Sequence, residues 1–134
     1  MVSSTLTNIK IWEVVVRFLS IVKSAENQGA PPQALLDAIG KLTEDSLKDG
    51  SVVSTGGLGT TGTAVRMRIV KGKITATDGP FTEAKEVIGG FAILEAPSKR
   101  EAIEATRRFL QLHREHWPKW EGECELRELV FLAP

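Results

Sequence analysis

The sequence lacks several features that usually assign a chain to a structural or functional class. Only one of its 134 residues, Cys124, is a cysteine. No disulfide can therefore form within the chain, and we expect a reducing, cytoplasmic compartment. An excess of one charge is also absent, because 17 Lys+Arg balance 17 Asp+Glu. A dedicated nucleic-acid binder normally carries a basic excess, so this balance argues against such a partner.

Long apolar runs are missing as well. No uninterrupted run approaches the roughly 20 residues that a membrane-spanning helix needs. The start of the chain also has no clear apolar core of a signal peptide. We therefore expect no membrane partner.

The apolar patterning predicts one α+β domain, residues 14–134, after an N-terminal extension, residues 1–13. That extension is either an arm that packs Trp12 on a neighbour or a result of start-site choice. Two helices are predicted, one from Pro31-Pro32 to Gly50 and one from Pro97 to about His116, where Ser98 and Glu101 form a capping box. The predicted strands are 14–23, 51–55, 63–70, 74–77, 91–96 and 124–132.

The first strand, Val14–Lys23, is largely apolar on both faces. Helices of so small a domain can cover only one face of its sheet, and a strand that is apolar on both faces is usually covered on both. The second face needs a partner, so we expect a homodimer.

One stretch is hard to explain by hydrophobic patterning. It is the signature segment, residues 77–91, which reads TDGPFTEAKEVIGGF. Asp78-Gly79 followed by Pro80 predicts a sharp turn. Thr82 is a suitable N-cap for a short helix through Val87, which Gly89-Gly90 would end.

The signature segment resembles that of the DGPF family within the YCII-related proteins, whose usual wording is close to TDGPFAETKE followed by GGF. The stretch VVVRFLSIVKS, residues 14–24, resembles the family's opening strand, and the resemblance covers about residues 16–134. It implies a ferredoxin-like antiparallel sheet with two main helices on one face, and two chains that pair into a dimeric α/β barrel.

The resemblance implies no particular reaction, because the functions of this family are largely unassigned. Its members are often associated in genomes with extracytoplasmic-function sigma factors. Some YCII relatives place a His–Asp pair near the end of the first strand and the first helix. This chain has no histidine there, so a mechanism built on that pair does not carry over.

Two interpretations of the signature segment stay open. It is a demanding turn, in which each glycine and proline serves the backbone, or it lines a cleft. In the second case Asp78 is the candidate catalytic acid or base, since a carboxylate beside apolar surface can have its pKa raised. Lys85 or Arg66 would then hold an anionic group, and Phe81 would form an apolar wall. The full set of ligand-binding candidates is Arg66, Arg68, Phe81, Glu83, Lys85 and His113.

Other motifs favour structural roles. The glycine-rich stretch at 56–62 lacks the Gly-Lys-Ser/Thr of a phosphate loop, and no predicted helix follows it. His113 and His116 are three residues apart, but no third ligand is indicated, so we expect no metal site. Cys124 is expected to be buried and inert, and Trp117 and Trp120 to pack at the exit of the second helix.

The sequence therefore predicts a homodimer that binds a small molecule near the signature segment, without a cofactor. Whether it is an enzyme is left open. The alternative is a non-catalytic regulatory or interaction protein. An enzyme predicts convergent polar groups in a pocket, whereas a regulator predicts an exposed apolar patch.

Overall fold

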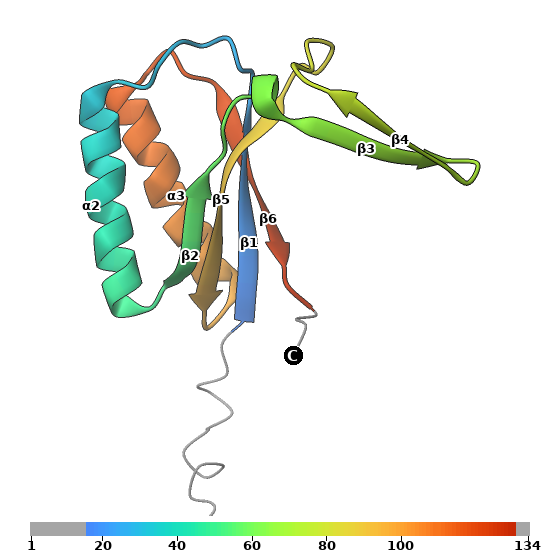
Figure 1. Ribbon diagram of the computed structural model, residues 1–134. Coiled ribbons are helices and arrows are strands. Elements are labelled where there is room, and N and C mark those ends of the chain that lie inside the picture. The colour runs from blue at the N-terminus through green and yellow to red at the C-terminus, as the bar shows by residue number, and fades with distance from the viewer. Residues whose placement is uncertain (1–15, 131–134) are drawn as a thin grey trace, which may run out of the picture.

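A four-stranded antiparallel sheet with two helices packed on one face forms the body of the protein (Figure 1). The computed structural model describes residues 16–130, so the expected extension at 1–13 lies outside the described residues. The strands of this sheet run in the order β2-β5-β1-β6. Their bounds are Val16–Ser24 for β1, Val52–Gly57 for β2, Val87–Ala96 for β5 and Gly122–Glu128 for β6. The α+β fold that the sequence predicts is confirmed.

Helix α2, Gln33–Asp49, begins and ends where its prolines and glycine predict. Pro32 occupies the N-cap position with an extended backbone, which directs the chain into the first turn. Gly50 follows the last turn with φ 83°, a left-handed conformation that glycine adopts without a Cβ penalty. Leu35 is the residue of α2 that is fully buried, at 1% exposure.

Helix α3, Lys99–His116, confirms the predicted N-cap. The Ser98 hydroxyl accepts a hydrogen bond of 3.4 Å from the backbone N–H of Glu101. Ala102 and His113 of this helix are buried. The helix ends two residues before Pro118, which disfavours helical backbone in the residue before it.

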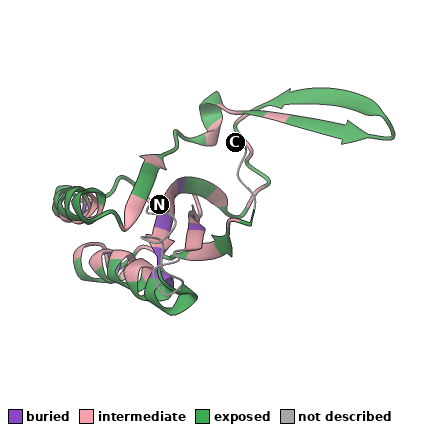
Figure 2. Ribbon diagram, turned by 90° about the horizontal axis from the view of Figure 1, so that it is seen from below, coloured by how far each residue is buried: buried purple, intermediate pink, exposed green. Residues whose placement is uncertain are grey.

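The core lies where the sheet meets these helices. Phe18 of β1 pairs with Leu94 of β5 in the antiparallel register, and both are buried with Ala96 and Ala102. Figure 2 shows that few of the described residues are buried. The helices therefore do not close completely on the sheet.

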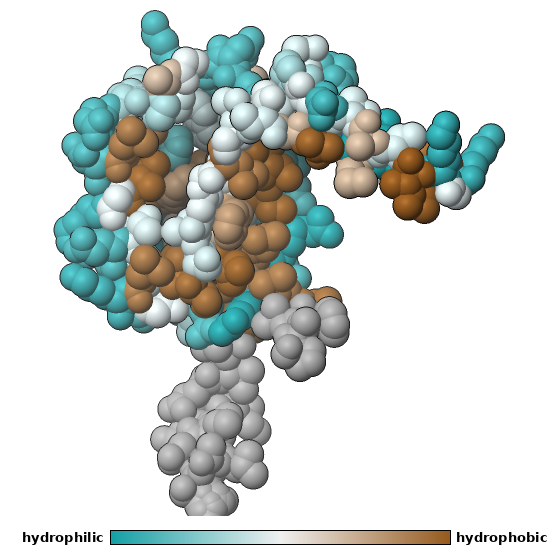
Figure 3. Space-filling model, viewed as in Figure 1, coloured by the Kyte–Doolittle hydropathy of each residue, from teal (hydrophilic) through white to brown (hydrophobic). Residues whose placement is uncertain are grey.

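The opposite face of the sheet, which we call the open face, has an apolar strip at its centre. The register places Leu19 and Ile21 of β1 beside Ile93 and Phe91 of β5. These residues alternate along the strands with the buried core residues, so their side chains lie on the face away from the helices. Figure 3 shows apolar surface along the strands in this view. The helices cover one face only, as the sequence predicts.

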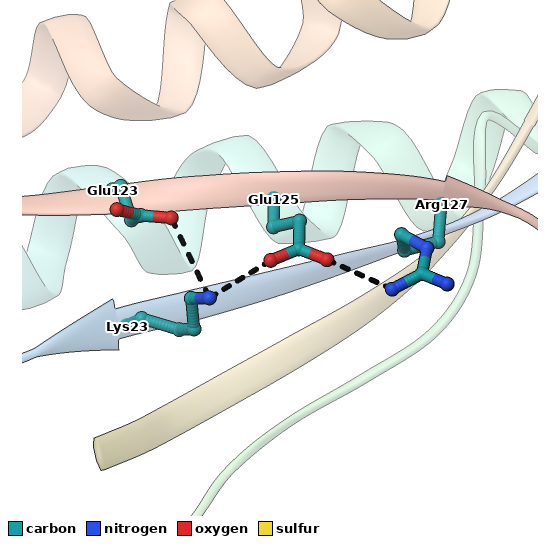
Figure 4. Close-up of polar contacts among 4 residues, drawn as sticks. All are labelled: Lys23, Glu123, Glu125 and Arg127. Atoms are coloured by element: carbon teal, nitrogen blue, oxygen red, sulfur yellow. Dashed lines mark hydrogen bonds and ion pairs between the residues drawn. The ribbon is translucent and has the colours of Figure 1, made fainter. Parts of the chain in front are cut away.

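Charged pairs border the open face. Lys23 lies 2.8 Å from Glu125 and 3.6 Å from Glu123, and Arg127 lies 3.0 Å from Glu125 (Figure 4). These pairs are partly exposed, and pairs of this kind typically contribute about 1 kcal/mol or less to stability. These charged residues lie along one side of the apolar strip.

Strands β3, Val65–Val70, and β4, Lys73–Asp78, form a separate hairpin that projects away from the helices (Figure 1). The predicted turn is confirmed, because Lys71 and Gly72 both have positive φ angles, 52° and 79°. Two successive residues of this kind match the right-handed twist of a tight hairpin.

The short helix expected from Thr82 to Val87 is wrong. The chain makes one turn there, closed by a 3.1 Å hydrogen bond from the Ala84 N–H to the Phe81 carbonyl. Val87 is already the first residue of β5 and pairs with Ser24. The predicted N-cap is present in the sequence, but strand β5 begins at Val87, the residue at which that helix would end.

Candidate functional site

A cavity of about 570 Å³ opens between the two helices and the sheet. Helix α2 lines it with Leu35, Leu36, Ile39 and Leu42. Figure 3 shows apolar side chains beside the opening near α2. A largely apolar hollow of this size is typical of small-molecule sites.

His113 of α3 is the imidazole that lines the cavity. The residue is 8% exposed, and the centre of its ring lies 4.7 Å from that of Phe109 and 4.4 Å from that of Trp120. Nδ1 lies 3.0 Å from the Phe109 carbonyl oxygen. A carbonyl only accepts, so Nδ1 carries the proton and Nε2 keeps a lone pair. Burial lowers the pKa of His113, which favours this neutral form.

The end of the signature segment forms part of the cavity rim. Gly89 and Gly90 of β5 line it, together with Gly56 and Gly57 of β2. A Cβ added at Gly90 would lie 3.1 Å from the Gly56 carbonyl oxygen, so the two strands approach closely here. The sequence predicts that the glycine pair ends a helix, whereas the structure places it in a strand beside the cavity.

The start of the signature segment is held by a hydrogen-bond network that the sequence does not reveal. The Gly79 N–H donates to the Ala64 carbonyl at 2.8 Å, and the Phe81 N–H donates to the Thr61 hydroxyl at 3.1 Å. Thr61 in turn donates its N–H and its hydroxyl to the two oxygens of Glu26, both at 2.7 Å. These bonds lower the pKa of Glu26. The network connects the loop after β1 to the signature turn through the 3₁₀ turn Thr61–Thr63.

Three of the predicted site residues meet beside this turn. Arg66 lies 2.6 Å from Glu83, and its guanidinium carbon lies 3.9 Å from the centre of the Phe81 ring. The hydrogen bond from Arg66 is the main cause that lowers the pKa of Glu83, and Arg68 adds a smaller electrostatic effect. Arg66 is therefore already engaged by a carboxylate and an aromatic face, an arrangement that fixes the base of the hairpin.

Asp78 and Lys85 are exposed. Asp78 is the last residue of β4 and pairs with Val65, so it lies at the base of the hairpin. Two further hollows open on the described part of the chain, one along α3 and β6 and one lined by Glu86, Glu121 and Glu123. None of the three is lined by Asp78, Phe81 or Lys85.

A family model for the YCII-related domain matches residues 16–109, which is more than half of the chain. The chain belongs to the YCII-related family. No curated protein matches it. The matched residues of this YCII-related protein include β1, α2, the hairpin, the signature segment and most of α3, but they end before His113.

The surroundings of Cys124, Trp117 and Trp120 in this YCII-related protein favour a structural role. Burial raises the pKa of the Cys124 thiol to about 11, so the thiol is protonated at neutral pH. Trp117 and Trp120 stack at the exit of α3, with centroids 6.2 Å apart.

Within residues 16–130, no three His, Cys, Asp or Glu side chains gather as a metal site would require. No helix in the same range is long and apolar enough to cross a membrane.

The buried imidazole predicts a pH dependence of stability. The folded pKa of His113 lies below its unfolded value, so the unfolded state binds a proton first as the pH falls. We expect the free energy of unfolding to decrease from pH 7 to pH 5 with the uptake of up to about one proton, and His113→Gln to remove most of this slope. Urea unfolding at several pH values measures it.

His116→Gln is the matched control, because His116 lies one turn away and is only half-buried. The difference in slope between the two variants isolates the effect of the buried ring. Carboxylates with lowered pKa, such as Glu26 and Glu83, lose their contribution only at lower pH. An unchanged slope in His113→Gln would contradict the burial of a neutral imidazole.

Proposed function

We propose that this protein is a cytoplasmic, DGPF-type homodimer that binds a small, largely apolar molecule in the cavity between the helices and the sheet. The observation that supports it most strongly is the combination of apolar walls with one neutral imidazole, that of His113. Ligand sites usually combine an apolar lining with a few polar groups that fix orientation.

The lining indicates the chemistry of the ligand. The lone pair on His113 Nε2 calls for a hydrogen-bond donor, and the ring lies against Trp120. A flat, hydroxylated aromatic molecule satisfies both requirements. In that complex His113 is the group that can accept the hydroxyl proton, which allows chemistry without a cofactor. The cavity favours His113 over Asp78 for this role, because Asp78 does not line it.

The test is titration calorimetry of the full chain with simple phenols and with aliphatic alcohols of similar size. We expect wild type to prefer the phenols. His113→Phe should weaken phenol binding about tenfold, because one hydrogen bond contributes about 1 kcal/mol or slightly more. Leu36→Trp, a substitution of an exposed residue at the mouth, should weaken it too by filling the opening.

Asp78→Asn is the matched control and should bind phenols as wild type does. If Asp78→Asn abolishes binding while His113→Phe retains it, the site is at the signature turn and not in the cavity. If no member of the panel binds wild type, the proposal of a phenol site is overturned.

The open face supports the homodimer. Its apolar strip, Leu19, Ile21, Phe91 and Ile93, lies on the face of the sheet away from the helices, and apolar strips of this kind commonly become buried by a partner. Light scattering at micromolar concentration should give about twice the 14.6 kDa chain mass. A stable monomer would contradict the dimer but not the cavity.

The alternative, a regulatory or interaction protein, has one observation in its favour. The hairpin exposes large apolar residues such as Met67 and Ile69, which an enzyme without partners has no reason to expose. The two functions predict different effects of replacing His113. A regulator should bind its partner equally well, whereas a small-molecule binder should bind its ligand more weakly.

A further inference from the structure

Two polar residues are buried within residues 16–130. They are Ser20 of β1 and His113 of α3, at 7% and 8% exposure. Both line the cavity between the helices and the sheet. The proposed function gives His113 a role but leaves Ser20 without one. Burying a polar side chain is unfavourable unless it is hydrogen-bonded, so the place of Ser20 calls for a physical reason.

Ser20 lies on the floor of the cavity. It alternates with the buried Phe18 along β1, so its side chain points from the sheet toward the helices. Its neighbours in the register are Ala92 of β5 and Leu126 of β6, which carry no polar side-chain group. Ser20 and Ala92 are both small, lie side by side and line the cavity. The floor therefore carries a hydroxyl within a patch that is otherwise apolar.

The partner of the Ser20 hydroxyl inside the protein is a weak one. Burial raises the pKa of the Cys124 thiol, and a hydrogen bond from Ser20 partly offsets this effect. Sulfur is a weak acceptor, whereas a carbonyl oxygen is a good one. A hydroxyl rotates to suit its surroundings, so a ligand oxygen above the floor can take the Ser20 proton from the sulfur.

The charges of the lining indicate that this ligand oxygen is neutral. Among residues 16–130 the cavity is lined by one charged side chain, that of Arg108, which is exposed. No buried charge therefore awaits a counter-ion. Burying an ionised group against a single hydroxyl is strongly unfavourable, since the group loses its hydration. The acceptor that suits Ser20 is an uncharged carbonyl oxygen.

We propose that Ser20 is a second ligand-binding residue of the cavity, and that the ligand is a hydroxylated aromatic carbonyl compound. The ligand hydroxyl donates to Nε2 of His113, and the ligand carbonyl oxygen accepts from the Ser20 hydroxyl. This inference rests on the proposed function and narrows the ligand from phenols in general to phenols that carry a neutral carbonyl group. One contact on α3 and one on β1 fix the orientation of the ring.

Titration calorimetry of the full chain with para-hydroxyacetophenone and para-ethylphenol tests it. The two probes are similar in size and shape, and they differ in one carbonyl oxygen. Ser20→Ala removes the hydroxyl with little change in side-chain volume. We expect this variant to bind the ketone about tenfold more weakly than wild type, because the carbonyl is left without a partner in an apolar place. Its affinity for para-ethylphenol should stay within about twofold of wild type.

Using both probes with both proteins isolates the contact with Ser20. The carbonyl group also makes the phenol hydroxyl more acidic, which strengthens its hydrogen bond to His113. This contribution is the same in wild type and in Ser20→Ala, so it cancels when the affinity ratios are compared. Binding of para-ethylphenol by Ser20→Ala also shows that the cavity of the variant is intact.

Ser54→Ala is the matched control, because Ser54 is an exposed serine of the same sheet that does not line the cavity. It should bind both probes as wild type does. Cys124→Ala separates ligand binding from the internal hydrogen bond of Ser20. It removes the sulfur and keeps the hydroxyl, so its preference for the ketone should stay near that of wild type.

The outcomes separate the two proposals. If neither these probes nor simple phenols bind wild type, the phenol site and this inference are overturned together. If both probes bind wild type and Ser20→Ala weakens them equally or not at all, the carbonyl contact is overturned and the phenol site stands. If Cys124→Ala weakens ketone binding as much as Ser20→Ala does, the effect comes from packing beneath the cavity, which also overturns the contact.

Discussion

Replacing Gly79 with alanine should lower the free energy of unfolding by about 3 kcal/mol, the upper part of the range for overpacked sites. A Cβ at this position would overlap the backbone carbonyl of Thr61. Backbone atoms cannot move aside as a flexible side chain can, so the turn itself must shift. That shift would break the 2.8 Å bond from the Gly79 N–H to the Ala64 carbonyl. Urea unfolding measures the loss.

Gly89→Ala is the matched control, since it makes the same change in the same signature segment. A Cβ at Gly89 meets nothing within 4 Å, and its φ is not in the left-handed region. Its free energy of unfolding should stay within about 0.5 kcal/mol of wild type. If the two variants were equally stable, the signature turn would not be anchored against Thr61.

Leu35→Ala should cost about 2 to 3 kcal/mol, the lower part of the range for buried leucine truncations. Leu35 is 1% exposed, so its loss removes buried apolar contacts. It also lines the existing cavity, so the truncation enlarges a hollow rather than creating a new one. Thermal or urea unfolding of the variant gives the value.

Leu36→Ala, one residue along α2, is the control because Leu36 is 46% exposed. It should cost less than about 1 kcal/mol. A cost in Leu35→Ala no greater than in Leu36→Ala would contradict the packing of α2 on the sheet.

The signature segment was predictable only where its conformation depends on neighbouring residues. The turn at Asp78-Gly79 and the hairpin turn at Lys71-Gly72 depend on a few neighbouring residues, and both were predictable. The helix after Thr82 was predicted from equally local signals and is wrong, because Val87 pairs with Ser24 in the sheet. Pairing between residues far apart in the chain overrides a weak helix start.

The candidate site was also predictable only in part. Phe81 and Glu83 are close in the chain, so their proximity was expected, whereas the bond from Arg66 to Glu83 spans 17 positions. Glu26 and Thr61 gave no signal at all, since a glutamate and a threonine 35 positions apart carry no motif. His113 was a candidate, but nothing in the spacing showed which side chains would surround it.

By itself the sequence determined the α+β class and the bounds of α2 and α3, because periodicity, capping residues and turn glycines act within a few residues. The signature segment and the opening strand also determined the family. Only the tertiary structure decided that the cavity lies between α2, α3 and the sheet, that His113 faces it, and that the hairpin projects uncovered. Each of these depends on how distant elements pack, and packing geometry is not encoded in any single stretch of chain.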